Sequence, residues 1–246
     1  MKKIITLFVV CFLTAYSCHK NETNGSHPKT DTITNTTTPQ TPPIQEAAEQ
    51  ISGFPATGKK ASDFVSGSYE IQYEAEGDLN QDGLPDLALV VRKKADTLAG
   101  RTILVILKNP DTTYKLDKVS TKAFPDEYNG DGYKMHDPED ISIEKGELHI
   151  NLYDIGPNGN LFCTFKYLNN TLVLTYIETY NMGAGSHQAL YYEPMKGKFV
   201  QEVTHTMEED APTTSKTFYL KKENYRFESA SPDNIIRKVY GSVDVE

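Results

Sequence analysis

Acidic and amide side chains alternate with other residues at the start of the stretch D-L-N-Q-D-G-L-P-D, which begins at Asp78. Counted from Asp78, they fall at positions 1, 3, 5 and 9, and Gly83 at position 6 allows a sharp turn. Calcium takes about six to eight oxygen ligands, which a tight loop supplies from alternating side chains and one backbone carbonyl. We therefore predict a calcium site formed by Asp78, Asn80, Asp82, the carbonyl of Leu84, and Asp86.

The residues around this loop predict strands on both sides. The preceding S-Y-E-I-Q-Y-E alternates between apolar and polar residues, and the following L-A-L-V-V is a continuous apolar run typical of a buried strand. We expect 69–76 and 87–92 to pair. Position 12 is Leu89 instead of the Glu that gives EF-hands a bidentate ligand, which predicts weak affinity, on the order of 10⁻⁴–10⁻³ M. Such a site is a structural staple and not a sensor; the alternative is an Asx-rich hairpin connection without metal.

A calcium loop between strands resembles the loops of FG-GAP and VCBS repeat proteins, in which an Asp at position 9, here Asp86, closes the site. Downstream, D-P-E-D-I-S-I over 137–143 matches a strand that follows such a loop in a group of bacterial envelope proteins. The resemblance covers roughly residues 62–205. It implies a β meander and a calcium ion, and it implies no activity, because none is established for that group.

The N-terminus has the pattern of an export signal. Lys2 and Lys3 precede an apolar stretch that is too short to span a bilayer. A-Y-S-C then resembles the lipobox of bacterial lipoproteins, although Tyr16 stands where a small residue is usual. We predict that 1–17 is a lipoprotein signal peptide, with plain secretion as the alternative. A lipid on Cys18 would anchor the protein to a membrane of the bacterial cell envelope, and we expect this to be the outer membrane. The folded domain would then lie in the periplasm or at the cell surface.

Behind the predicted anchor, residues 18–43 are dominated by Thr, Asn and Pro, which predicts a disordered tether. The remaining 44–246 form the predicted β-rich domain. Its first residues, 44–51, space their apolar side chains as a short helix does. Cys163 lies in an apolar-alternating segment and has no partner for an intramolecular disulfide once Cys18 is lipidated, so we expect a buried, inert thiol.

Turn residues between alternating segments predict hairpins. Lys145-Gly146, Asn169-Asn170 and Lys196-Gly197 each separate two such segments, and 218–227 is a fourth candidate. These features predict a mainly β chain: an antiparallel meander of hairpins, arranged as a sandwich, an open barrel or propeller-like sheets, with a short N-terminal helix.

The net charge of −9 and the isoelectric point near 5.2 argue against a nucleic-acid partner, because nucleic acid attracts clustered Lys and Arg. The chain contains no H-x-x-x-H, G-x-S-x-G or P-loop pattern. We therefore predict a non-catalytic binding or structural module. The sequence does not distinguish between a protein and a glycan as its partner. The alternative is an envelope hydrolase acting on glycan or peptide, with carboxylates near the loops 126–140 and 181–187. The stretch 126–140 itself is expected to be a solvated loop that presents Tyr128, Tyr133 and His136.

Overall fold

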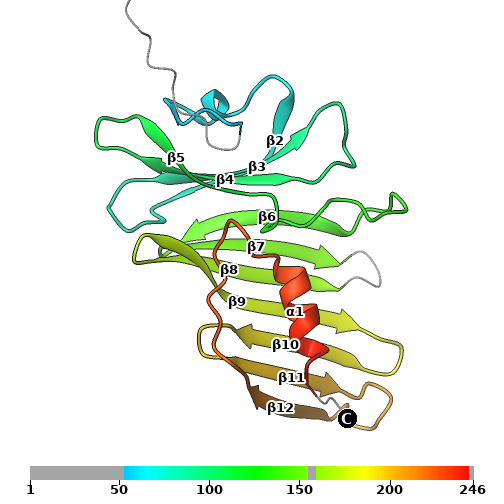
Figure 1. Ribbon diagram of the computed structural model, residues 1–246. Coiled ribbons are helices and arrows are strands. Elements are labelled where there is room, and N and C mark those ends of the chain that lie inside the picture. Colours follow the sequence, from blue (N-terminus) through cyan, green and yellow to red (C-terminus); the bar gives the residue numbers. More distant parts are fainter. Residues whose placement is uncertain (1–52, 155–158, 244–246) are drawn as a thin grey trace, which may run out of the picture. The chain divides into compact units, whose positions relative to one another are not determined.

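The computed structural model describes residues 53–154 and 159–243, all within one compact unit that spans Glu46–Glu246. Strands account for 51% of the structure and helices for 7%. The strands form two antiparallel sheets, one of which curls into a half-barrel (Figure 1). The predicted mainly β meander is confirmed. The signal peptide, Cys18, the tether and the predicted helix over 44–51 lie outside the described residues.

The first sheet has five strands in the order β1-β5-β4-β3-β2. Their bounds are β1 Thr57–Gly58, β2 Tyr69–Gly77, β3 Asp86–Lys93, β4 Thr102–Lys108 and β5 Tyr114–Ser120. The continuous apolar runs form the central strands β3 and β4, which are buried on both faces. One face packs against Phe54 and Phe64, the latter in the 3₁₀ turn Ala61–Phe64, and the other face joins a larger core.

The second sheet is a seven-stranded meander in the order β12-β11-β10-β9-β8-β7-β6. Its strands are β6 His136–Glu144, β7 Glu147–Asp154, β8 Asn160–Leu168, β9 Thr171–Met182, β10 His187–Glu193, β11 Lys198–Thr204 and β12 Thr213–Tyr219. The three predicted hairpins at 145–146, 169–170 and 196–197 are all formed. Their turns carry the positive φ angles for which Gly and Asn are suited, as at Asn170 (φ 61°) and Gly197 (φ 65°).

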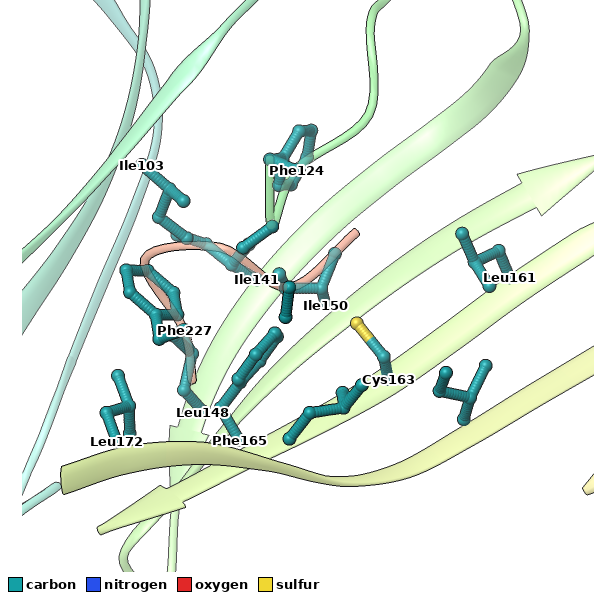
Figure 2. Packing of buried hydrophobic residues seen from close by; sticks show 14 of the residues in the cluster. Ile103, Phe124, Ile141, Leu148, Ile150, Leu161, Cys163, Phe165, Leu172 and Phe227 are labelled. Atoms are coloured by element: carbon teal, nitrogen blue, oxygen red, sulfur yellow. The ribbon is translucent and has the colours of Figure 1, made fainter. Parts of the chain in front are cut away.

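The two sheets share one hydrophobic core. Strand β2 packs on β6, and a Cβ at Gly77 would lie 2.6 Å from the carbonyl oxygen of Ile143, so only glycine allows this approach. Figure 2 shows Ile103 of β4 and Phe124 in one cluster with Ile141 and Ile150 of the second sheet. Cys163 is buried in the same core, as predicted, and burial raises the pKa of its thiol.

The C-terminal part of the chain differs from the prediction. The prediction of a hairpin over 218–227 is wrong. Strand β12 pairs with β11, and the residues after β12 run back across the core. Phe227 packs edge-on against Phe165, with ring centroids 5.2 Å apart, and donates its backbone N–H to the Leu172 carbonyl at 2.9 Å. Burial of Phe227 outweighs the strand-like alternation of the segment.

A helix that the sequence analysis missed, α1 (Pro232–Tyr240), follows this segment and lies across the second sheet in Figure 1. It begins with Pro at its first turn beside Asp233 and carries Arg237 in its last turn, an arrangement that favours a helix. Its apolar side, with Ile236 and Val239, is buried in the shared core. Within 53–154 and 159–243, no helix has the length and apolar character to cross a membrane.

Candidate functional site

The predicted calcium loop connects β2 to β3, and Gly77 pairs with Asp86 at its base. The predicted pairing of 69–76 with 87–92 is therefore confirmed. The loop turns through two left-handed residues, Gln81 (φ 63°) and Gly83 (φ 88°). A Cβ at Gly83 would meet no atom within 4 Å, so the backbone conformation, and not lack of space, requires glycine there.

Asx side chains organise the loop by accepting hydrogen bonds from its backbone. The Asp78 carboxylate accepts the N–H groups of Asp82 and Gly83, both at 3.0 Å. The Asn80 Oδ1 accepts the Asp82 N–H at 3.0 Å. Asp82 in turn accepts the Leu84 N–H at 2.8 Å and the side-chain amide of Asn80 at 2.9 Å. The structure thus brings four of the five predicted ligand residues into one network.

The fifth residue, Asp86, is fully buried beneath the loop. One of its carboxylate oxygens accepts the N–H groups of Leu79 (3.0 Å) and Asn80 (3.1 Å), and the other accepts the Lys108 N–H of β4 at 3.0 Å. Burial raises the pKa of Asp86, while the three N–H donors oppose that shift by favouring the carboxylate. Asp86 therefore fixes the start of the loop to the neighbouring strand.

The loop also touches the second sheet, a contact that the sequence did not indicate. The Gln81 side-chain amide donates to the Lys145 carbonyl at 3.4 Å, in the turn between β6 and β7. At that turn a Cβ on Gly146 would lie 2.1 Å from the Gln81 Nε2, so the glycine leaves room for the contact. The loop conformation is consequently linked to the junction between the sheets.

The donor set of the loop consists of oxygens and carries three formal negative charges. None of the ion pairs among the described residues involves Asp78, Asp82 or Asp86. Within the same residues, no three His, Cys, Asp or Glu side chains are grouped as a metal site. A carboxylate oxygen that accepts one hydrogen bond keeps a further lone pair. The residues present therefore fit a hard, oxygen-seeking cation such as Ca²⁺.

A buried ionic cluster, also missed at the sequence level, lies between the sheets. Arg101 and Glu139 form a bidentate pair, with Nη1 2.5 Å from Oε2 and Nη2 3.0 Å from Oε1. The guanidinium also donates to the Pro125 carbonyl and lies 4.4 Å from the centre of the Phe124 ring. Tyr73 donates its hydroxyl to Glu139 at 3.0 Å, and burial together with this carboxylate raises the pKa of Tyr73 to about 12.

The stretch 126–140 is only partly the solvated loop that the sequence predicts. Its tip is exposed at Tyr133, and the Asn129 side chain accepts the Tyr133 N–H at 2.9 Å. His136 and Glu139, however, are buried in β6, because this end of the stretch continues the second sheet. The expectation that His136 is presented on a surface loop is therefore wrong.

A cavity of about 530 Å³ brings this segment together with β8, β9, β10 and α1. It connects the loop region 126–136 with Asn181, as the hydrolase alternative required. Its carboxylates are Asp126 and Asp233, and Asp233 is paired with Arg237 on the same helix. His187 is not among the lining residues, and its ring nitrogen Nδ1 hydrogen-bonds the Tyr180 hydroxyl at 2.8 Å.

No family model, no curated protein and no solved structure matches this chain. The similarity of the loop to FG-GAP and VCBS loops stays a prediction from the residues themselves. The fold defines the class of the protein as a mainly β chain of two antiparallel sheets, with one short α-helix among the residues that the structure describes. The two features of this fold that bear on function are the 78–86 loop and the cavity.

Proposed function

We propose that this chain is a lipid-anchored, non-catalytic binding or structural module of the bacterial cell envelope, whose β domain is stabilised by Ca²⁺ in the 78–86 loop. The observation that carries the proposal is the loop network itself. The loop carries three carboxylates that form no ion pair with any described cation. It bonds to β4 through Asp86 and to the second sheet through Gln81.

In this function each residue of the loop has a separate task. Asp78, Asn80, Asp82 and Asp86 would hold the ion through side-chain oxygens. Leu84 would add its carbonyl. Bound calcium supplies positive charge that offsets the repulsion among these carboxylates. Asp86 keeps the loop seated on β4 by accepting three backbone N–H groups. The ion would thus stabilise the pairing of β2 with β3 and the contact with the 145–146 turn.

The location and partners follow from the N-terminal pattern and the charge. A lipid on Cys18 would hold the domain at the outer membrane through the tether 18–43, so the bilayer is the partner of the N-terminus. The charge of −9 disfavours nucleic acid, and the ligand of the domain is a protein or a glycan. Extracytoplasmic calcium is abundant enough to fill a weak site.

Thermal unfolding of the full-length protein with and without calcium tests this function. With 10 mM Ca²⁺ and a dissociation constant on the order of 10⁻⁴–10⁻³ M, we expect about 1.4–2.7 kcal/mol of stabilisation. For a domain of this size, that corresponds to a melting temperature higher by roughly 3–10 °C, reversed by excess EDTA.

Two alanine variants separate the metal site from ordinary turn geometry. Asp82→Ala removes a proposed ligand and is expected to abolish the calcium response. Asp96 makes a comparable exposed Asx turn by accepting the N–H groups of Leu98 and Ala99 at 3.1 Å, so Asp96→Ala should keep the response. A melting temperature that is insensitive to calcium and EDTA in the unmodified protein would remove the metal from the proposal.

The cavity supports an envelope hydrolase as the second candidate function. It joins two of the regions named for that activity and contains Asp126 and Asp233, the carboxylates that acid–base hydrolysis would need. The Asp233 carboxylate is already paired with Arg237 on the same helix, which favours binding without turnover. Conversion of a bound glycan or peptide to products, with loss of conversion in Asp126→Asn, would establish the hydrolase instead.

A further inference from the structure

The inner face of the second sheet changes from apolar to polar where it meets the cavity. One row of paired positions on this face is apolar throughout: Ile141, Ile150, Cys163, Ile177 and Tyr192. Farther along β9 the same face carries Thr179 and Asn181, and Asn181 pairs with Gln188 of β10. Side chains that only fill a core would continue the apolar row. These polar residues instead line the cavity.

Two buried polar atoms among the lining residues have no hydrogen-bond partner within 53–154 and 159–243. They are His136 Nδ1 and Thr179 Oγ1, on residues that are only 6% and 9% exposed. A buried polar group without a partner costs about 1–3 kcal/mol. Of the three such atoms among the described residues, two therefore lie on residues of one cavity, which points to a ligand that supplies the missing partners.

The surroundings of His136 define what it offers to a ligand. The backbone of Gly159 accepts from the ring, which opposes the lowering of the His136 pKa by burial. A neutral ring that donates through one nitrogen keeps the other nitrogen as an acceptor. Burial lowers the pKa of His136, which keeps the ring neutral near pH 7. His136 therefore presents an acceptor for a hydroxyl group, and Thr179 presents a hydroxyl that both donates and accepts.

The charges around the cavity exclude an anionic ligand. Arg237 donates to Asp233 in the preceding turn of α1, so its charge is already neutralised. The remaining charged lining residue is Asp126, an acid. Phosphate or carboxylate recognition requires an available cation or a cluster of N–H donors, and the described wall offers neither. The polar part of the wall consists mainly of neutral amides and hydroxyls, as in Asn181 and Gln188.

The rest of the wall is apolar or aromatic. Leu161, Leu190 and Ile236 line it, together with the rings of Tyr128 and Tyr240. The Gln188 amide donates to the Tyr240 hydroxyl at 3.3 Å, which holds α1 over the polar end of the sheet. A volume of about 530 Å³ lies within the range of about 300–1,000 Å³ of small-molecule sites. The cavity thus combines apolar surface with hydroxyl-recognising groups.

We infer that this cavity binds an uncharged saccharide of about the size of a disaccharide. The C–H faces of the sugar rings would lie on the leucine, isoleucine and tyrosine side chains. The ring hydroxyls would pair with His136, Thr179 and the amides of Asn181 and Gln188. The inference rests on the proposed binding function and gives it a site and a ligand class. A neutral peptide would also need amide partners. It lacks the closely spaced hydroxyl groups of a sugar, which are the groups that His136 Nδ1 and the Thr179 hydroxyl would bind.

Saturation-transfer difference NMR on the full-length protein tests the inference. The probes are four neutral disaccharides (maltose, cellobiose, lactose and N,N′-diacetylchitobiose), glucose 6-phosphate and a blocked Ala-Gln-Ala peptide. We expect saturation transfer to at least one neutral disaccharide, and weaker or no transfer to the phosphorylated sugar and the peptide. Absence of transfer to all four disaccharides, or preferential binding of the peptide or the phosphate, would overturn the inference.

Thr179→Val provides the decisive variant, because it removes the unpartnered hydroxyl at nearly constant volume. We expect at least a tenfold loss of disaccharide affinity with an unchanged or higher melting temperature, since no native hydrogen bond is lost. Thr171→Val, the same change on the same strand outside the cavity, should leave affinity unchanged. Equal affinity in Thr179→Val, or a lower melting temperature, would show that the hydroxyl does not serve a ligand.

The calcium and saccharide measurements have separate outcomes. The lining residues of the cavity include no residue of the 78–86 loop. Saccharide binding without a calcium response would refute the calcium staple and leave the inference intact. A calcium response without saccharide binding would refute the inference and leave the proposed calcium-stabilised module intact.

Discussion

Arg101 and Glu139 join the two sheets through an ion pair that is almost completely removed from water. The two residues lie just before β4 and within β6, and their side chains are 1% and 0% exposed. The same guanidinium donates to the Pro125 carbonyl at 3.0 and 2.8 Å, and Pro125 lines the cavity. The pair therefore ties the sheet junction to one wall of the candidate binding site.

Removing one partner of this pair leaves a buried charge without compensation. We expect Arg101→Met and Glu139→Gln each to lower the free energy of unfolding, Arg101→Met by about 3–5 kcal/mol and Glu139→Gln by a smaller amount, because Gln remains a neutral acceptor. For a domain of this size the larger loss lowers the melting temperature by roughly 6–20 °C. Urea unfolding followed by circular dichroism gives the free energy of unfolding, and thermal unfolding followed by the same signal gives the melting temperature.

A matched exposed pair provides the control for that prediction. Lys166 and Glu147 lie 3.2 Å apart on the second sheet and are about one-third exposed, so Lys166→Met should cost about 1 kcal/mol or less. The double variant Arg101→Met/Glu139→Leu should recover much of the loss, because it leaves neither charge behind. An Arg101→Met cost as small as that of Lys166→Met would contradict a stabilising role for the pair.

The parts of this fold that neighbouring residues determine could be predicted from the sequence. The turns at Lys145-Gly146 and Asn169-Asn170 are encoded by residues that accept positive φ, and the alternating segments on either side set the register. The 78–86 loop is similarly local, since its Asx side chains bond to backbone groups within the loop. Local chemistry also marked α1, through Pro232 and Asp233, although the sequence analysis passed over it.

Contacts between distant segments could not be predicted in this way. Nothing next to Arg101 indicates that its partner is Glu139, 38 residues later, because the pairing depends on how the sheets pack. The cavity collects side chains from four strands, a connecting segment and α1, and its polar character is visible only once the inner face of the sheet is known. His136 looked like a loop residue for the same reason.

Burial of His136 predicts a loss of stability under mildly acidic conditions. Burial lowers the pKa of this ring, helped by Arg101 and opposed by Glu139, Asp154 and the bond to Gly159. The unfolded chain, with a histidine pKa near 6.5, then binds more protons than the folded protein. The stabilising contribution of neutral His136 is present above about pH 6.5 and is lost progressively as the pH falls toward the lower folded pKa.

Comparison with a variant isolates this group from the other titrating residues. We expect the free energy of unfolding of the unmodified protein to fall more between pH 7.5 and pH 5.5 than that of His136→Gln. His205→Gln is the control, because His205 lies just after the end of β11, partly exposed and next to Glu208. Equal pH dependence in the unmodified protein and in His136→Gln would show that His136 is not the group responsible.

Asp86 is predicted to stabilise the loop whether or not calcium is bound. In Asp86→Asn, an NH₂ group replaces one of the two carboxylate oxygens. The backbone N–H groups that this oxygen accepted, from either the loop or Lys108, then have no acceptor. Each buried donor left without an acceptor costs about 1–3 kcal/mol. We expect this loss in EDTA as well as in calcium, whereas Asp82→Ala should lower stability mainly when calcium is present. A cost for Asp86→Asn that appears only with calcium would instead assign Asp86 to the metal alone.

The predicted lipid anchor depends on a single cysteine, and the chain supplies its own controls. Cys18 follows the small residue Ser17 at the end of the apolar segment, Cys11 lies within that segment, and Cys163 is buried in the core. In cells fed an alkyne-bearing palmitate, we expect the unmodified protein, Cys11→Ala and Cys163→Ala to carry the label and to sediment with membranes. Cys18→Ala should lose the label, because it lacks the thiol that would carry the acyl chain. Label retained in Cys18→Ala would exclude this residue as the lipidation site, and an unlabelled protein released in soluble form would favour plain secretion.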